Sequence, residues 1–310
     1  MKAAFNLTAV GRGFWRWLAC LLFCLGLAGC GNPPYPRGPV EQLFVGQALP
    51  VFSQKIVAGQ RINLANAPLA ATPQKVADPD KPKPILLFVH GSPGDWKAWS
   101  YYLKSPELAS FAERIAIDRP GFGGSAQGAV VTDLRQQAAL MAQLIPDGQK
   151  AIVVGHSLGG PLAVWMAIDS PDKVCGVVSI AGSLSSRYEA PRWYNLLADS
   201  ALLAWAVPNE MAWSNREMMV LSAELRKLEA AAGQLRIPVT LIQGEKDSLV
   251  DPQTVGEFQK HAPAAWLNVK SLPKETHFVL WEKPELIVSA IKETPCALSP
   301  RTGSRMARYP

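Results

Sequence analysis

A serine stands between glycines where an apolar, valine-rich run ends: residues 153–162 read VVGHSLGGPL. Gly-x-Ser-x-Gly between a buried strand and a helix exposes a nucleophilic hydroxyl on a tight, strained turn. Ser157 is therefore the candidate nucleophile, and His156 beside it is expected to be a bystander. The backbone N–H of Leu158, where the next helix opens, is a candidate donor to a developing oxyanion. An ordinary Gly/Ser loop is the competing interpretation.

A second glycine-rich loop, HGSPG at residues 90–94, directly follows the apolar run ILLFV. A loop in this position is expected to present backbone N–H groups to the site, with that of Ser92 as the second oxyanion donor. We expect His90 to hold the loop through hydrogen bonds rather than to act as a base. Asp118 and Arg119, after the next predicted strand, are expected to brace the neighbouring loop.

A serine nucleophile needs a base and a carboxylate that orients this base. The stretch GEKDSLVDP, residues 244–252, follows the apolar run PVTLIQ and offers two carboxylates. Asp247 lies nearer the end of the predicted strand and is the candidate acid, whereas Asp251 precedes a proline and is typical of a helix N-cap. His277 is the histidine in a loop after the last predicted strand, and it is the candidate base.

Apolar runs and helical stretches alternate along the chain, as repeated βα units do. Continuous apolar runs are typical of strands buried on both faces of a parallel sheet, so the pattern indicates a doubly wound, mostly parallel α/β sheet. Two β-prone runs predict a hairpin around residues 58–60. Residues 183–235 interrupt the alternation with a helical pattern, and we expect them to form an inserted lid. The expected strands of the main sheet are residues 85–90, 114–118, 151–156, 174–182, 238–245 and 266–272.

The net charge of +6 sits at the two ends of the chain. Residues 1–29 and residues 294–310 each carry three basic residues and no acid, which leaves residues 30–293 neutral. A nucleic-acid-binding protein is expected to carry its charge on the folded body, so this class is set aside. Residues 40–293 are long enough for one globular domain, and residues 294–310 are expected to form an irregular basic tail.

The N-terminus combines a basic stretch with the apolar run of residues 17–29, which is short for a bilayer span and typical of a secretory signal. The run ends in LAGC, which resembles the lipobox of bacterial lipoproteins. The resemblance implies a signal peptide at residues 1–29 and a lipid on Cys30. It also implies a membrane anchor in the cell envelope, with Gly31 favouring an outer membrane facing the periplasm. An uncleaved anchor or a plain signal peptide is the alternative. Residues 30–39 are proline-rich and predict a tether.

The five cysteines do not indicate a disulfide framework. Cys20 and Cys24 belong to the signal segment. Cys175 lies in the apolar run VCGVVSI and is expected to be a small buried hydrophobe. Cys296 lies in the predicted tail, and a bridge between Cys175 and Cys296 is the less favoured alternative.

Five motifs, HGSPG, DRPGFGGS, GHSLGG, GEKDSLVDP and THFVLWEKPE, resemble the pattern of the α/β-hydrolase superfamily in order and spacing. The resemblance extends from about residue 55 to about residue 292. It implies a serine hydrolase with the triad Ser157, Asp247 and His277, acting on a small-molecule substrate. The expected reaction is hydrolysis of a carboxylic ester. No cofactor or metal is expected, and no Cys/His or carboxylate cluster suggests a metal.

Other reactions stay open within the resemblance. The branch with HGSPG and a serine elbow also holds carbon–carbon bond hydrolases, perhydrolases and proline iminopeptidases. HGSPG in place of HGGPG makes a peptidase less favoured. Dehalogenases and epoxide hydrolases of this branch use aspartate at the elbow, and Ser157 argues against them. A catalytically silent envelope binding protein is the remaining alternative.

Tryptophans predict where the substrate binds. Trp193 and Trp213 in the expected lid, with Trp96 and Trp99 near the HGSPG loop, are candidates for an apolar substrate pocket. The competing interpretation is that the lid residues only pack the lid onto the core. A pocket of this kind predicts a preference for esters of short or medium acyl chains over charged substrates.

Overall fold

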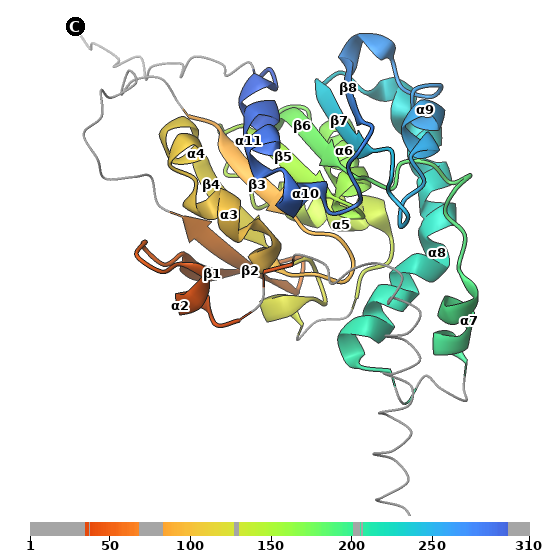
Figure 1. Cartoon of the computed structure of the whole chain (residues 1–310), viewed down its shortest axis with the longest axis horizontal. Coiled ribbons are helices and arrows are strands. Elements are labelled where there is room, and N and C mark those ends of the chain that lie inside the picture. Colours follow the sequence, from red (N-terminus) through yellow and green to blue (C-terminus); the bar gives the residue numbers. More distant parts are fainter. Residues whose placement is uncertain are drawn as a thin grey trace, which may run out of the picture.

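The computed structural model describes residues 35–36, 38–67, 83–126, 130–200, 205 and 207–296, and the structural statements below concern these residues. Eight strands form one sheet in the order β1-β2-β4-β3-β5-β6-β7-β8 (Figure 1). Strand β2 is antiparallel to both of its neighbours, and the strands from β4 to β8 are parallel to one another. The strands are β1 (Val51–Val57), β2 (Gln60–Ala67), β3 (Ile85–Val89), β4 (Glu113–Ile117), β5 (Ala151–His156), β6 (Val174–Ile180), β7 (Val239–Gly244) and β8 (Leu267–Leu272). The predicted α/β sheet is confirmed.

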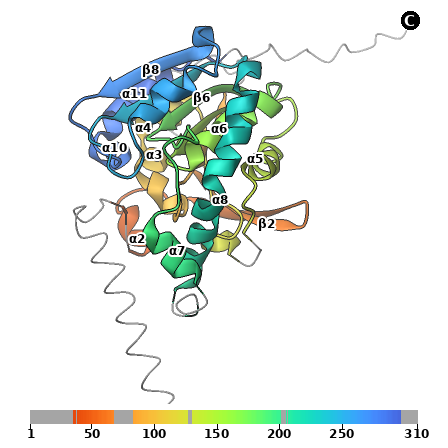
Figure 2. The ribbon, with the colours of Figure 1, turned by 90° about the vertical axis from the view of Figure 1, so that its right-hand side faces the viewer.

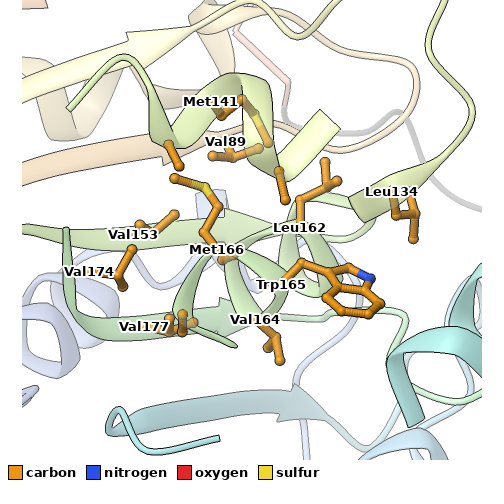
Figure 3. Packing of buried hydrophobic residues seen from close by; sticks show 14 of the residues in the cluster. Val89, Leu134, Met141, Val153, Leu162, Val164, Trp165, Met166, Val174 and Val177 are labelled. Carbon is orange, nitrogen blue, oxygen red and sulfur yellow. The ribbon is translucent and has the colours of Figure 1, made fainter. Parts of the chain in front are cut away.

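The central strands are buried on both faces because their side chains alternate between two apolar layers. Along β3, Leu86 and Phe88 join one layer, whereas Leu87 and Val89 join the other. The first layer contains α3 (Ser100–Lys104), α4 (Pro106–Phe111), α10 (Val279–Glu282) and α11 (Pro284–Glu293). The second contains α5 (Leu134–Ala142), α6 (Gly159–Asp169) and α9 (Gln253–Phe258). Figure 3 shows side chains of α6 among those of α5, β3 and β5 in the second layer.

Two helical stretches of the chain are each divided in the structure. Residues 96–112 form a 3-10 helix, η1 (Trp96–Trp99), followed by α3 and α4. The chain turns at Ser105, whose hydroxyl accepts from the Leu108 N–H, and Pro106 then opens α4. The last helical stretch divides in the same way, where Pro284 begins α11 after α10. Proline lacks the N–H that would continue the preceding helix, so it fits only the first turn of a new one.

The segment between β6 and β7, residues 183–235, carries two further helices and is called the lid segment below. They are α7 (Trp193–Asp199) and α8 (Asn209–Ala231), followed by a short 3-10 helix, η4 (Ala232–Gln234). Figures 1 and 2 show α8 running along one edge of the molecule with α7 beside its first half. The two helices are joined by Asn195 and Asn215, whose side chains lie 2.8 Å apart.

Cys175 and Cys296 form a disulfide in the structure, which corrects the expectation of two separate thiols. Their Cα atoms are 4.7 Å apart although 121 positions separate them in the sequence. The sequence could not show this proximity, because it arises only when α11 packs back across the sheet and brings the following residues beside the start of β6. The bridge ties this part of the predicted tail to the core.

The N-terminal part of the described chain also contacts the domain. The Tyr35 hydroxyl donates to Asp95 Oδ1 at 2.5 Å, and the Tyr35 ring lies edge-on to Trp281 at 5.6 Å between ring centroids. A short helix, α2 (Val40–Leu43), follows. Cys30 and the predicted signal segment lie outside the described residues. Among the helices of the described residues, none is both long and apolar enough to span a bilayer.

Candidate active site

Ser157 occupies a sharp turn between β5 and α6. Its φ angle is +53°, in the left-handed region that side chains rarely adopt. The flanking glycines are required by close backbone contacts. A Cβ on Gly155 would lie 2.1 Å from the carbonyl oxygen of Gly159, and a Cβ on Gly159 would lie 2.2 Å from that of Val89. The Gly-x-Ser-x-Gly spacing therefore follows from the tight crossing of strand and helix, which presents Ser157 at the carboxyl edge of the sheet.

His277 and Asp247 are brought together from the loops after β8 and β7. His277 Nδ1 lies 2.8 Å from Asp247 Oδ2, and both residues are buried. The other Asp247 oxygen accepts from the N–H groups of Leu249 and Val250 at 2.9 Å each. Burial alone would raise the pKa of Asp247, but the hydrogen bond and charge of His277, with these N–H groups, hold it below its ordinary value. The carboxylate is therefore ionised and fixes the orientation of the imidazole.

The other candidate acid and the neighbouring histidine take no part in this pair. Asp251 Oδ1 instead accepts from the Gln253 N–H at 2.9 Å, at the start of α9. His156 Nε2 lies 3.1 Å from the His277 carbonyl oxygen. Burial, together with the nearby His277, lowers the pKa of His156 to about 3, so its ring stays neutral. Its role is to support the His277 backbone.

The HGSPG loop passes directly over the nucleophile. A Cβ on Gly91 would lie 2.9 Å from the Ser157 Cβ. His90 Nδ1 lies 2.7 Å from the Gly91 carbonyl oxygen, and His90 Nε2 accepts from the Arg119 N–H at 3.0 Å. Burial and the Arg119 charge lower the pKa of His90 well below its ordinary value, so the neutral ring braces the loop, as the sequence predicts. Within the described chain the N–H groups of Ser92 and Leu158 have no hydrogen-bond acceptor.

A buried polar network joins this loop to the lid segment. Glu217 of α8 accepts from the Ser92 hydroxyl at 2.5 Å and from Arg119 Nη1 at 2.6 Å. Arg119 Nη2 in turn donates to the Gly91 carbonyl oxygen at 2.9 Å, and Gln137 Nε2 donates to Glu217 at 2.9 Å. Asp118 braces the adjoining loop, where it accepts from the Trp96 N–H at 2.7 Å.

Glu217 is not among the site residues predicted from the sequence, although the sequence carries a signal for it. Glu217 precedes Leu221 by four residues and Leu225 by eight, so it shares the buried face of α8 with them. A carboxylate on the buried face of a helix must find a partner, because an unpaired charge there costs several kcal/mol.

Ser157 and His277 open onto one cavity of about 270 Å³ beneath the lid segment. Ser92 and Leu158 line it as well, so the structure brings the predicted nucleophile, base and both N–H donors to a common space. Its apolar walls include Val207, Met211, Met218, Leu249 and Val250, and its polar walls include Glu189, Arg192, Asn195 and Asn215. A cavity of this kind holds a small, mainly apolar molecule with a few polar anchoring points.

None of the four predicted pocket tryptophans lines this cavity, which corrects the expectation. Trp96 and Trp99 are buried in the apolar layer on the other face of the sheet, where Trp99 stacks on Phe88 at 4.9 Å. Trp193 points outward and is 69% exposed, and Trp213 is half-buried in α8. Trp96 and Trp99 follow the HGSPG loop closely in the sequence, but this closeness does not indicate which face of η1 packs against the core.

Glu189 is a wall residue that the sequence did not single out. Its Oε1 atom is buried without a hydrogen-bond partner in the described chain. Burial, which outweighs a hydrogen bond from Ser183, raises the pKa of Glu189 to about 7. This carboxyl therefore changes charge near neutral pH inside the cavity. In the described residues no cluster of three or more histidine, cysteine, aspartate or glutamate side chains could hold a metal ion.

The strained serine turn, the His–Asp pair and the doubly wound sheet define a hydrolase of the α/β type. A model of the alpha/beta hydrolase family matches residues 86–290, and the chain belongs to this family.

Individual relatives resemble parts of the chain. Epoxide hydrolase 3 of Xenopus tropicalis is 34% identical over 180 residues, which cover 56% of this chain and 48% of that protein. A pimeloyl-[acyl-carrier protein] methyl ester esterase of Vibrio campbellii is 32% identical over 108 residues, covering 35% of this chain and 41% of the esterase. The chain spans between 26% and 48% of the length of the first curated relatives it matches.

Solved structures share the fold. A putative aryl esterase from Burkholderia cenocepacia superposes with a TM-score of 0.58 at 18% sequence identity, over 78% of this chain and 96% of that one. At this level of identity the likeness concerns the fold alone.

Proposed function

We propose that the protein is a serine hydrolase that cleaves ester-type bonds of small, mainly apolar substrates through an acyl-enzyme on Ser157. One observation carries the proposal: His277, bonded to Asp247 at 2.8 Å, opens onto the same cavity as Ser157. The left-handed turn at Ser157 and the two unpaired N–H groups beside it supply the remaining parts of an acyl-transfer site.

The proposed reaction proceeds in two halves. His277 Nε2 takes the Ser157 proton as Oγ attacks the carbonyl carbon, and the carbonyl π electrons move onto its oxygen. The N–H groups of Ser92 and Leu158 stabilise this oxyanion, and each such donor contributes about 3 kcal/mol in the transition state. The oxyanion collapses, the alcohol leaves with the proton from His277, and water then attacks the acyl-enzyme by the same steps. The acid is released and Ser157 regains its proton.

The alternatives differ in the group that Ser157 attacks or in the fate of the acyl-enzyme. Relatives named as epoxide hydrolases match parts of this chain, but the residue at the elbow is serine, whereas epoxide hydrolases of the resembling branch use aspartate there. An ester substrate is favoured because a methyl ester esterase is among the relatives and because the cavity walls are mainly apolar. Carbon–carbon bond hydrolysis, perhydrolysis and aminopeptidase activity are outcomes of the test below.

The test uses a fluorophosphonate probe on the purified full chain. We expect labelling of wild type and none of Ser157→Ala, with Ser183→Ala as a matched control that lines the same cavity and keeps its labelling. A well-folded wild type that resists the probe would overturn the proposal in favour of a silent binding protein. Nitrophenyl esters of increasing acyl length, beside aminoacyl nitroanilides and vinylogous diketones, then separate esterase from peptidase and carbon–carbon bond cleavage.

We further propose that the protein is lipidated at Cys30 and anchored in the bacterial envelope, facing the periplasm from the outer membrane. The LAGC stretch supports this location. The Cys175–Cys296 disulfide supports it too, because such bonds persist in oxidising compartments. Metabolic labelling with a palmitate analogue should mark wild type and Cys24→Ser but not Cys30→Ser. Label retained on Cys30→Ser, or a membrane-bound uncleaved form of that variant, would contradict lipidation.

A further inference from the structure

Helix α7 turns its apolar side outward. Trp193, Leu196 and Leu197 are spaced i, i+3 and i+4, so they share one side of the helix, and they are 69%, 56% and 43% exposed. The opposite side, with Tyr194, Asn195 and Ala198, lines the catalytic cavity. Asn195 is also hydrogen-bonded to Asn215 of α8.

This arrangement inverts the usual pattern of a surface helix, which buries its apolar stripe and exposes its polar side. The opposite side of α7 faces the domain and is hydrogen-bonded to α8 through Asn195 and Asn215. The apolar side is therefore not needed to hold α7 in place. An exposed apolar stripe that includes a large aromatic side chain therefore points to a partner surface.

Most of the exposed apolar side chains belong to two segments in the lower half of the molecule. Eleven large hydrophobic side chains are exposed among the described residues. Four belong to the α7 region, and five belong to the segment from α2 to β1: Val45, Leu49, Val51, Phe52, Ile56, Trp193, Leu196, Leu197 and Trp205. Figures 1 and 2 show α2 and α7 in the lower half of the molecule, with α2 on the left and α7 on the right in Figure 1. The other two, Tyr101 and Val269, lie elsewhere, on α3 and β8.

The position of the predicted anchor indicates what kind of surface lies near the domain. Tyr35 is fixed to the domain through Asp95 and Trp281, and it lies only five positions after Cys30 in the sequence. Five residues reach at most roughly 17 Å, so a lipid on Cys30 would hold this part of the domain close to the bilayer. Tryptophan and leucine suit the boundary between headgroups and acyl chains, where an apolar helix side is buried without spanning the membrane.

We propose that the outer side of α7, formed by Trp193, Leu196 and Leu197, docks into the surface of a phospholipid bilayer beside the entrance to the catalytic cavity. The inference rests on the proposed lipid anchor and deepens the proposed function. The cavity then faces the membrane, and the favoured substrates are esters that partition into lipid.

The docking test does not depend on catalysis. Full-length lipidated protein in vesicles of phosphatidylethanolamine and phosphatidylglycerol is irradiated with a phospholipid that carries a diazirine in its acyl chain. Mass spectrometry then locates the cross-links. We expect cross-links at residues 193–197 in wild type and in Ser157→Ala, and their loss in Trp193→Gln/Leu196→Gln/Leu197→Gln. Glutamine keeps the helix propensity high, so α7 is expected to remain folded. The control variant Val269→Gln keeps the α7 cross-links.

A second readout separates docking from chemistry. The triple variant should turn over a water-soluble nitrophenyl ester as wild type does, while its turnover of a bilayer-resident ester falls on the order of tenfold, because part of the apolar contact is lost. Wild-type cross-links confined to the N-terminus, or equal losses on both esters, would overturn the docking surface. If neither ester is turned over but α7 is cross-linked, the proposed function fails and the docking surface stands.

Discussion

Arg119 and Glu217 form a fully buried ion pair between the loop after β4 and helix α8 of the lid segment. Arg119 Nη1 lies 2.6 Å from Glu217 Oε1, and neither side chain is exposed to solvent. The same two residues also bind the HGSPG loop: Arg119 binds the Gly91 carbonyl oxygen, and Glu217 binds the Ser92 hydroxyl. This shared contact therefore sets the positions of both helix α8 and the HGSPG loop.

Loss of one partner of this pair should destabilise the whole domain. Glu217→Leu removes the carboxylate and leaves the Arg119 charge buried without an opposite charge. We expect the free energy of unfolding to fall by about 3–5 kcal/mol, measured by urea denaturation. Arg216→Gln, an exposed neighbour in α8, should change it by less than about 0.5 kcal/mol. A similarly small change for Glu217→Leu would contradict the assignment of a desolvated pair.

The serine turn should not tolerate a methyl group on its first glycine. In Gly155→Ala the new Cβ would lie 2.1 Å from the Gly159 carbonyl oxygen, which belongs to the main chain and cannot move aside as a flexible side chain could. We expect destabilisation by about 3 kcal/mol or more in thermal or urea unfolding. Gly256→Ala is the matched control: its Cβ meets no atom within 4 Å, and in α9 alanine should stabilise by about 0.5–1 kcal/mol.

The two aspartates after β7 should differ in their effects on rate. Asp247→Asn removes the charge that orients His277, so kcat on a nitrophenyl ester should drop on the order of 10⁴-fold. Asp251→Asn keeps a side chain that can accept from the Gln253 N–H, so kcat should be unchanged. Equal rate losses in the two variants would show that the acid has been misassigned.

Glu189 should make stability depend on pH. Its pKa rises from an ordinary value of 4.5 to about 7 in the folded protein because of burial. Between these values the folded state binds the proton more tightly than the unfolded state. The resulting stabilisation is complete below pH 4.5 and is lost as the pH rises through 7. Glu189→Gln stays neutral throughout.

The measurement is the Tm of wild type and Glu189→Gln from pH 4 to pH 8. The variant's Tm relative to wild type should increase between pH 4.5 and pH 7 and then stay level. Glu210→Gln, an exposed control in α8, should show no such rise. A Tm difference that is independent of pH would refute the raised pKa.

The fold was accessible from the sequence because its signals are local. A doubly buried strand such as β5 needs a continuous apolar run, and Gly155 is required by a contact with Gly159 only four residues away. The proximity of Asp247 to His277 was accessible for a related reason, since both follow neighbouring parallel strands and must meet at one edge of the sheet.

The remaining features depend on packing between distant segments. Trp99 turns toward Phe88 rather than toward the cavity because η1 meets the sheet with that side, and no local pattern reveals which side this is. The partner of Cys175 lies 121 residues away. Glu189 acquires its raised pKa through burial, in a cavity whose walls come from segments far apart in the sequence.

The folded domain begins before the proline-rich stretch of residues 30–39 ends, because Tyr35 within this stretch packs against it. Its ring lies against Trp281, which contacts the His156 ring at 5.0 Å, and His156 in turn supports His277. A recombinant form that starts at residue 40, where the proline-rich stretch ends, would lack the Tyr35 ring and its contact with Trp281. A secreted, anchor-free version for crystallisation or screening is better cut between Cys30 and Tyr35, so that the aromatic contacts of Tyr35, Trp281 and His156 behind His277 are kept.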